Sequence, residues 1–222
     1  LATDDALILE LTSRGMADRD ASGWRLCHGL FGQSVLRAAD MRGKRAKLHG
    51  LAADWLADYY ESGHIGRAHS LAHHLVAANR PTEALNHFLV ATQESIDAGD
   101  FLAARELVDT WLDTAQKCGI DAGSEAMSDG LILRCRILAG LGETHRAIAL
   151  ATTQVAHAEA QAQPNALGAW HRALGAAQVT AGDPNAALEH LHKAVELDDA
   201  HRQLARRRLA EALWRCGRFD EA

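Results

Sequence analysis

The chain has 222 residues, of which 48% are hydrophobic and 23% are charged, and its formal net charge is −6 at pH 7. This composition is typical of a soluble folded protein rather than of a disordered chain. The negative charge argues against a protein built mainly to bind nucleic-acid phosphates. No apolar run approaches the roughly 18 residues that a membrane-spanning helix needs.

The four cysteines, Cys27, Cys118, Cys135 and Cys216, lie far apart in the sequence, and no pair has CxxC spacing. This pattern favours reduced thiols in a cytoplasmic protein over a disulfide framework or a zinc site. We therefore predict a cytoplasmic location.

The N-terminal segment, residues 1–42, mixes helical and extended patterns. "DDALILELTSRGM" predicts a short amphipathic helix that ends at Gly15, and "GWRLCHGL" predicts a short β element near residues 22–28. A helix through "FGQSVLRAAD" follows. The polar turn "DMRGKR" then leads into a long helix, "RAKLHGLAADWLADYYESG". We place the boundary of this segment at residue 42.

Residues 43–222 carry a recurring turn signal. A turn residue is followed by a polar residue and, five positions after the turn residue, by alanine. Glycine supplies the left-handed conformation that ends a helix, and asparagine is its best substitute. The intervals between successive turns are 20, 43, 40 and 35 residues. The interval of 20 predicts that helix 81–97 is the second helix of one pair and the first helix of the next. The intervals of 43 and 40 predict long helices or a loop near "KCGIDAGSEAMSDG". The turn residues are Asn79, Gly99, Gly142, Gly182 and Gly217.

Small residues occupy two fixed positions relative to each turn, as is needed where two helix backbones approach closely. A larger side chain at either position would cost about 1–3 kcal/mol through overpacking. Seven residues before the turns stand Ala72, Thr92, Cys135, Gly175 and Ala210, and five residues after them stand Ala84, Ala104, Ala147, Ala187 and Ala222.

The stretch "LGAAQVTAGDPNAALEHLHKAVEL" resembles the tetratricopeptide repeat, a helix–turn–helix unit of about 34 residues. Departures from the family pattern are His171 at its usual tryptophan, Gln178 at its tyrosine and Arg134 at a leucine. The resemblance implies an all-α solenoid of helical hairpins in a right-handed superhelix. The last copy of the signal stops four residues after Arg218, which predicts that the array 43–222 is a fragment truncated within its last repeat.

The first half of the chain resembles the segment that follows the nucleotide-binding domain in STAND-type signalling ATPases, where the end of a winged-helix domain leads into tetratricopeptide repeats. Relatives with this layout include maltose-regulator-like transcription activators and ATPases attached to nucleotide cyclases or protein kinases. The chain itself contains neither GxxxxGK[ST] nor GxGxxG. The residues that carry this resemblance are Trp24, Arg25, Leu26, His28, Leu30, Arg45, Leu48 and His49, followed by "LAHHLVAANRPTEAL".

The two resemblances imply a non-catalytic protein-interaction and regulatory module from a larger bacterial-type signalling or transcription-regulatory ATPase. The alternative is a cis-acting autoinhibitory or sensor domain that controls the ATPase, cyclase, kinase or DNA-binding output of its parent. A plain structural spacer is a third possibility. We expect no enzyme activity, because the chain has no GxSxG elbow and no serine or cysteine in a recognisable catalytic setting.

A histidine pair and an arginine run could suggest a metal site and a nucleic-acid site, but both are better interpreted as ordinary surface residues of helices. His69 and His73 are spaced i, i+4, so two imidazoles could share one metal ion, but no further ligand completes the set. The three arginines at 206–208 point about 100° apart on a helix and cannot form one patch. With aromatic residues at only 5%, nucleic-acid binding is not expected. We predict no metal and no cofactor.

The most specific expectation concerns the inner face of the solenoid, which in this family type is lined by the first helix of each pair and accepts a peptide or partner helix. Arg136, Arg172 and Arg207 give one arginine per unit there, which suits an acidic peptide or a carboxylate-bearing segment of the parent chain. The competing interpretation is that they are ordinary solvated charges. Counting ten and six residues before each turn predicts a groove of His69, His73, Leu89, Gln93, Ile132, Arg136, Arg172, Ala176, Arg207 and Glu211.

Overall fold

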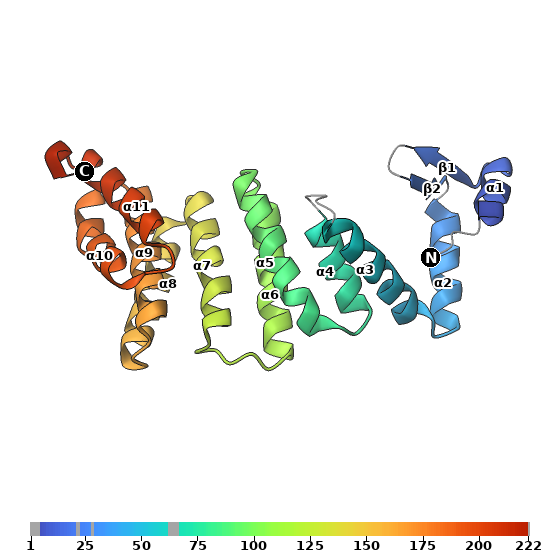
Figure 1. Cartoon of the computed structure of the whole chain (residues 1–222), viewed down its shortest axis with the longest axis horizontal. Coiled ribbons are helices and arrows are strands. Elements are labelled where there is room, and N and C mark those ends of the chain that lie inside the picture. The colour runs from blue at the N-terminus through green and yellow to red at the C-terminus, as the bar shows by residue number, and fades with distance from the viewer. Residues whose placement is uncertain (1–4, 21–22, 28, 62–66, 222) are drawn as a thin grey trace.

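The computed structural model describes residues 5–20, 23–27, 29–61 and 67–221. Within them, a small β-hairpin flanked by two helices leads into an elongated row of helices (Figure 1). Among these residues, no helix combines the length and the apolar character needed to cross a membrane. The elements are α1 (Asp5–Ser13), β1 (Ala17–Asp20), β2 (Gly23–Leu26), α2 (Gly29–Met41), α3 (Arg45–Glu61), α4 (Ala68–Ala77), α5 (Pro81–Asp97), α6 (Phe101–Lys117), α7 (Glu125–Gly140), α8 (Thr144–Ala160), α9 (Pro164–Thr180), α10 (Pro184–Leu197), α11 (Arg202–Arg215) and a final 3₁₀ turn, η1 (Phe219–Glu221).

The β element differs from its prediction. The strand expected near residues 22–28 is β2, and it is the second strand of an antiparallel hairpin with β1. The register pairs Ala17 with Leu26 and Asp20 with Gly23. The sequence of β1, "ADRD", has no alternation of apolar and polar residues and no β-branched residue, so the first strand was not predicted.

The predicted turn residues end the helices as expected. Asn79 has φ 62°, and the glycines at 99, 142, 182 and 217 have φ between 74° and 88°. The turn at Gly119, with φ 73°, lies in the loop predicted near "KCGIDAGSEAMSDG", whereas the turn at Ala162, with φ 52°, was not expected. They divide the two long intervals of the sequence pattern, so each interval contains two helices. The segment "EAMSDG", which we had placed in a loop, begins helix α7.

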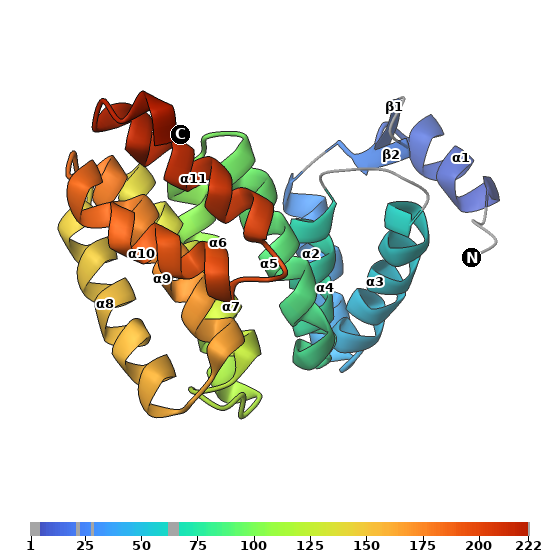
Figure 2. The same cartoon turned by 60° about the vertical axis from the view of Figure 1, so that its left-hand side comes forward.

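The helices are arranged in two layers. Neighbours in sequence pack as antiparallel hairpins, and in addition α5 contacts α7, α7 contacts α9, and α9 contacts α11. Alternate helices therefore run parallel and form a common face, which α6, α8 and α10 cover from the other side (Figure 2). The all-α solenoid of helical hairpins that the sequence predicted is confirmed.

The small residues beside the turns lie where the hairpins are tightest. The Sγ of Cys135 is 3.4 Å from the carbonyl oxygen of Ala147, so the two small positions of one hairpin meet. A Cβ at Gly175 would lie 2.6 Å from Cγ of Leu191. Ala210 is only partly buried, and Ala222 lies outside the described residues. The others are buried: Ala72, Ala84, Thr92, Ala104, Cys135, Ala147, Gly175 and Ala187.

Candidate functional site

The face shared by α5, α7, α9 and α11 is hollowed by a pocket of about 540 Å³, which we call the central pocket. Each of these four parallel helices contributes residues to the lining of this pocket. Apolar side chains alternate there with charged and amide groups, which is the composition of a surface that binds a partner with both kinds of group. Its lining is Leu89, Val90, Gln93, Glu94, Asp97, Asp129, Ile132, Leu133, Arg136, Ala169, Arg172, His201 and Leu204.

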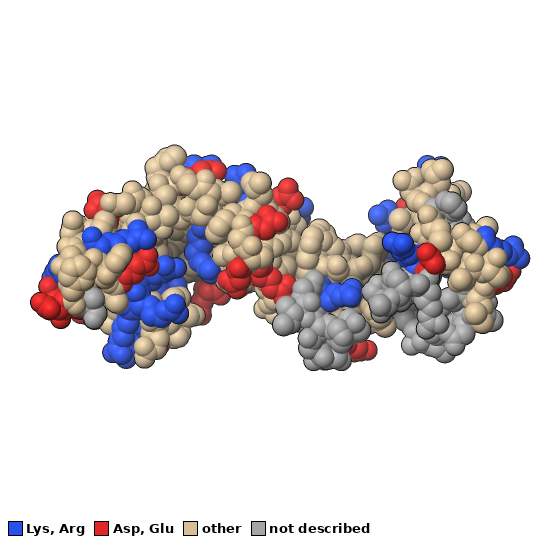
Figure 3. Space-filling model, turned by 90° about the horizontal axis from the view of Figure 1, so that it is seen from above, with Lys and Arg blue, Asp and Glu red and all other residues tan. Residues whose placement is uncertain are grey.

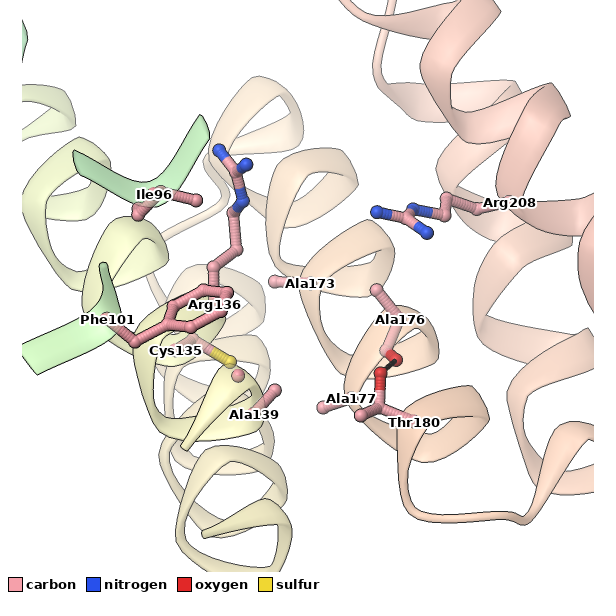
Figure 4. Close-up of a pocket in the computed structure, with 11 residues that line it drawn as sticks. Ile96, Phe101, Cys135, Arg136, Ala139, Ala173, Ala176, Ala177, Thr180 and Arg208 are labelled. Atoms are coloured by element: carbon pink, nitrogen blue, oxygen red, sulfur yellow. Dashed lines mark hydrogen bonds between the residues drawn. The ribbon is translucent and has the colours of Figure 1, made fainter. Parts of the chain in front are cut away.

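A second pocket of about 210 Å³ adjoins the central pocket and shares Arg136 with it. We call it the cationic pocket, because Arg136 and Arg208 are its only ionisable groups apart from the thiol of Cys135 among the described residues. Figure 4 shows these two arginines extending from opposite walls, Arg136 from α7 and Arg208 from α11. The floor between them consists of small residues, among them Ala139, Ala173 and Ala177.

A third pocket of about 310 Å³ adjoins the central pocket and shares Asp129, Ile132, Ala169 and His201 with it. We call it the acidic pocket. Its described lining contains four carboxylates and no lysine or arginine. The carboxylates are Glu125, Asp129, Asp198 and Asp199.

Arg136 is a cation to which no carboxylate of the described residues is bonded. Its Nη1 donates a hydrogen bond of 2.6 Å to Oε1 of Gln93, whose amide nitrogen donates in turn to Asp97 at 2.6 Å. Desolvation in the groove lowers the pKa of Arg136, and Arg208 and Arg172 lower it further against the opposing effect of Asp97. The guanidinium stays charged, because an arginine pKa lies far above neutral pH. An anion bound beside Arg136 would therefore offset both the lost hydration of its guanidinium and the repulsion from Arg208 and Arg172.

Arg172 has a different role from Arg136. Its Nε donates a hydrogen bond of 2.7 Å to Oδ2 of Asp198, and the two side chains are only 12% and 4% exposed. The other oxygen of Asp198 accepts from the backbone N–H of His201 at 3.1 Å, at the start of α11. This buried ion pair joins α9 to the α10–α11 connection and fixes the wall of the central pocket.

The predicted groove residues fall into three groups. Leu89, Gln93, Ile132, Arg136 and Arg172 all line the central pocket. Ala176 lines the cationic pocket. In the last repeat the neighbour of the predicted residue, Arg208 rather than Arg207, lines a pocket, and Glu211 accepts from Arg208 and Arg215.

The structure does not bring His69 and His73 together with the other predicted residues. Both lie on α4, whereas the pockets are lined from α5 onward. Their ring centroids are 4.6 Å apart, and the ring of His73 meets Phe88 edge-on at 5.6 Å. Desolvation, followed by the charge of His69, lowers the pKa of His73. Among the described residues, no group of three or more potential metal ligands gathers around them.

Several groove residues were missed by counting back from the turns. Asp198 and His201 belong to the connection before α11, and Leu204 and Arg208 lie on α11 itself. The run "ELDDAH" could have indicated an aspartate near the start of a helix. No pattern in the sequence indicates that the side chain of Asp198 points into the protein.

The fold and its concave pockets define this chain as a helical-repeat solenoid of the tetratricopeptide-like class. Residues 178–222, which comprise the end of α9, α10, α11 and the final turn, match the family described as Tetratricopeptide repeat. Repeats of this family generally mediate binding between proteins and are not themselves enzymes. The searches of curated proteins and of solved structures found no match.

Proposed function

We propose that the chain is a non-catalytic scaffold that binds an extended peptide segment of a partner protein in the groove formed by α5, α7, α9 and α11. The observation that carries this proposal is the position of Arg136, a desolvated cation bonded to an amide rather than to a carboxylate, at the junction of two pockets. A carboxylate of the partner would form a charge-assisted, bidentate pair with it.

The surroundings of Arg136 support this role. Leu89, Ile132 and Leu204 provide apolar surface on three different helices of the same pocket. Such contacts supply affinity through burial, while a few charged groups supply orientation. Of the polar residues predicted from the sequence, Gln93, Arg136 and Arg172 remain in this proposal. Arg172 supports the pocket wall through Asp198, and Arg208 takes the place of Arg207.

We also propose that residues 1–42 are the end of a winged-helix segment of a STAND-type regulatory ATPase located in the cytoplasm, and that residues 43–222 are its repeat array. The order of helix, β-hairpin and helix in α1–β1–β2–α2 supports this context. The surface of α2 and α3 supports it too, because large apolar side chains are exposed there and suit packing against a further domain. They include Leu30, Leu36, Met41, Leu48 and Leu51.

Selection from a display library of random 12-residue peptides tests the groove proposal, followed by fluorescence anisotropy on the enriched peptides. The key variant is Arg136→Met, which keeps the apolar stem and removes the charge. Loss of a charge-assisted hydrogen bond of about 1.5–3 kcal/mol should weaken binding about tenfold or more. Arg134→Met is the matched control, because Arg134 lies on the same helix and faces Asp109, 3.6 Å away, outside the groove. Enriched peptides that bind equally well to both variants would contradict the proposal.

A further inference from the structure

One face of a single helix, α7, carries opposite charges at its two ends. Glu125 and Asp129 lie in its first turns and line the acidic pocket, and Arg136 lies in its last turns and lines the cationic pocket. Ile132 stands between them and lines the central pocket. Asp129 and Arg136 are seven residues apart, which is about two helical turns and about 10 Å along the axis.

Glu125 and Asp129 are exposed, and among the described residues His201 is the one basic side chain that lines the acidic pocket beside them. Neither has an ion-pair partner among the described residues, whereas the other two acids of the same pocket do: Asp198 pairs with Arg172, and Asp199 with Arg202. Partial desolvation and the charge of Glu125 raise the pKa of Asp129, against the opposing effect of His201 in the same pocket. Like charges at i, i+4 also destabilise a helix by a few tenths of a kcal/mol. A cation at this place would offset these costs.

The other end of the groove carries excess positive charge. Arg208 and Arg215 share the single carboxylate of Glu211, so these three side chains together remain positive. Arg136 lies across the cationic pocket from Arg208 (Figure 4), and the hydrogen bond that its side chain makes among the described residues goes to the amide of Gln93. In the space-filling view of Figure 3, Lys and Arg side chains gather on the C-terminal part of the repeat array, at the left of the view, with acidic side chains among and beside them.

We infer that the groove selects an extended peptide segment of a partner protein that carries one acidic and one basic side chain about three to five residues apart, because an extended chain spans about 10 Å in three residues and side-chain reach adds to this. The acidic side chain lies at Arg136 and Arg208, and the basic one lies at Glu125 and Asp129. A small apolar side chain between them packs on Ile132 and Leu133. This inference rests on the proposed function and specifies the chemistry of its ligand.

The two charged ends provide selectivity in addition to attraction. A uniformly acidic segment would place carboxylates beside Glu125 and Asp129, and a uniformly basic segment would place cations beside Arg136. Like charges opposed across an interface are disfavoured, so each end rejects what the other end accepts. A segment with both signs at the right separation satisfies both ends.

The test repeats the display selection with three proteins: the unaltered chain, Arg136→Met, and the double variant Glu125→Gln with Asp129→Asn. Arg136→Met keeps the apolar stem of the arginine, and Glu125→Gln and Asp129→Asn are nearly isosteric. Melting curves followed by circular dichroism verify that each protein is folded. We expect peptides enriched on the unaltered chain to contain an acidic and a basic residue about three to five positions apart. Arg136→Met should remove only the acidic preference, and the double variant only the basic one. Each should weaken binding of a doubly charged peptide about tenfold.

Two other outcomes separate the inference from the function on which it rests. If peptides are enriched and depend on Arg136, but show no preference for a basic residue, the inference is overturned and the peptide groove stands. If no peptide is enriched above a surface without protein, or if none of the variants changes binding of the enriched peptides, both are overturned. Arg134→Met again serves as the control for an unrelated loss of charge on α7.

Discussion

Gly130 on α7 lies directly against the indole ring of Trp111 on α6. A Cβ at position 130 would be 2.1 Å from Cζ3 of that ring, and both residues are buried. The absence of a side chain at Gly130 therefore allows the largest aromatic residue of α6 to fill the space between two helices. Because α7 is the helix that carries Arg136, this contact also positions the groove.

We expect Gly130→Ala to lower the free energy of unfolding by about 1–3 kcal/mol, because the ring and the helix must separate to admit a methyl group. Gly50→Ala on α3 is the control, since a Cβ there would meet only Cβ of Ala78 at an ordinary 3.8 Å. That change should stabilise the protein by about 0.5–1 kcal/mol through helix propensity. Urea denaturation measures both. Equal effects of the same sign would show that α6 and α7 do not pack as described.

The hairpin of α9 and α10 gives a second packing prediction. Gly175→Leu places a branched side chain where even a Cβ would be 2.6 Å from Leu191, and Ala187→Leu enlarges a fully buried position. Each should lower the melting temperature by several degrees through overpacking. Thermal unfolding followed by circular dichroism at 222 nm is the measurement. Unchanged melting points in both variants would mean that the assigned hairpin contact is wrong.

Removal of the buried carboxylate of Asp198 should be costly. Asp198→Ala leaves the guanidinium of Arg172, whose side chain is 12% exposed, without its charged partner. Breaking a buried pair from one side typically costs about 3–5 kcal/mol. Glu189→Ala removes one partner of an exposed pair with Lys193, where solvent screens the interaction and the expected loss is far smaller. Denaturant midpoints of the two variants should therefore differ clearly, and similar midpoints would contradict the buried position of Asp198.

The stability of the α9–α10 hairpin should depend on pH through a pair of histidines. Nδ1 of His171 lies 3.1 Å from Nδ1 of His190, and the rings are stacked with centroids 5.2 Å apart. A hydrogen bond between these two nitrogens requires at least one neutral ring. Desolvation lowers the pKa of both histidines, and for His171 the neighbouring charges of His190 and Lys193 lower it further. Glu189 and Glu159 oppose these effects.

The folded pKa values of both rings therefore lie below the unfolded value of about 6.5, so the unfolded chain binds more protons in this range. The free energy of unfolding should fall as the pH falls through about 6.5, by about 1.4 kcal/mol per pH unit for each extra proton bound on unfolding, and level off below the folded pKa values. His171→Gln should reduce this slope, and the control His192→Gln, at an exposed position of α10, should change it less. Urea titrations between pH 5 and 8 measure the slopes. Identical slopes would contradict the prediction.

The sequence by itself determined the local features of the repeats. Asn79 and the glycines at 99, 142, 182 and 217 were identifiable because a left-handed turn restricts its residue type strongly. Counting back from a turn also selected Gln93, Arg136 and Arg172, which all line the central pocket, because the helical period relates residues of one helix whatever surrounds it.

The tertiary structure decided which helices share a face. The turn at Ala162 gave no recognised signal, and the turn at Gly119 was predicted only as one of two alternatives. The alternation of helices was therefore incomplete, and α4 with His69 and His73 was counted among the groove helices. The partner of Arg172 is Asp198, 26 residues further along the chain, and its approach depends on how α10 packs on α9. A helical period acts over a few residues, whereas burial, ion pairing and the shape of a groove arise only when distant segments come into contact.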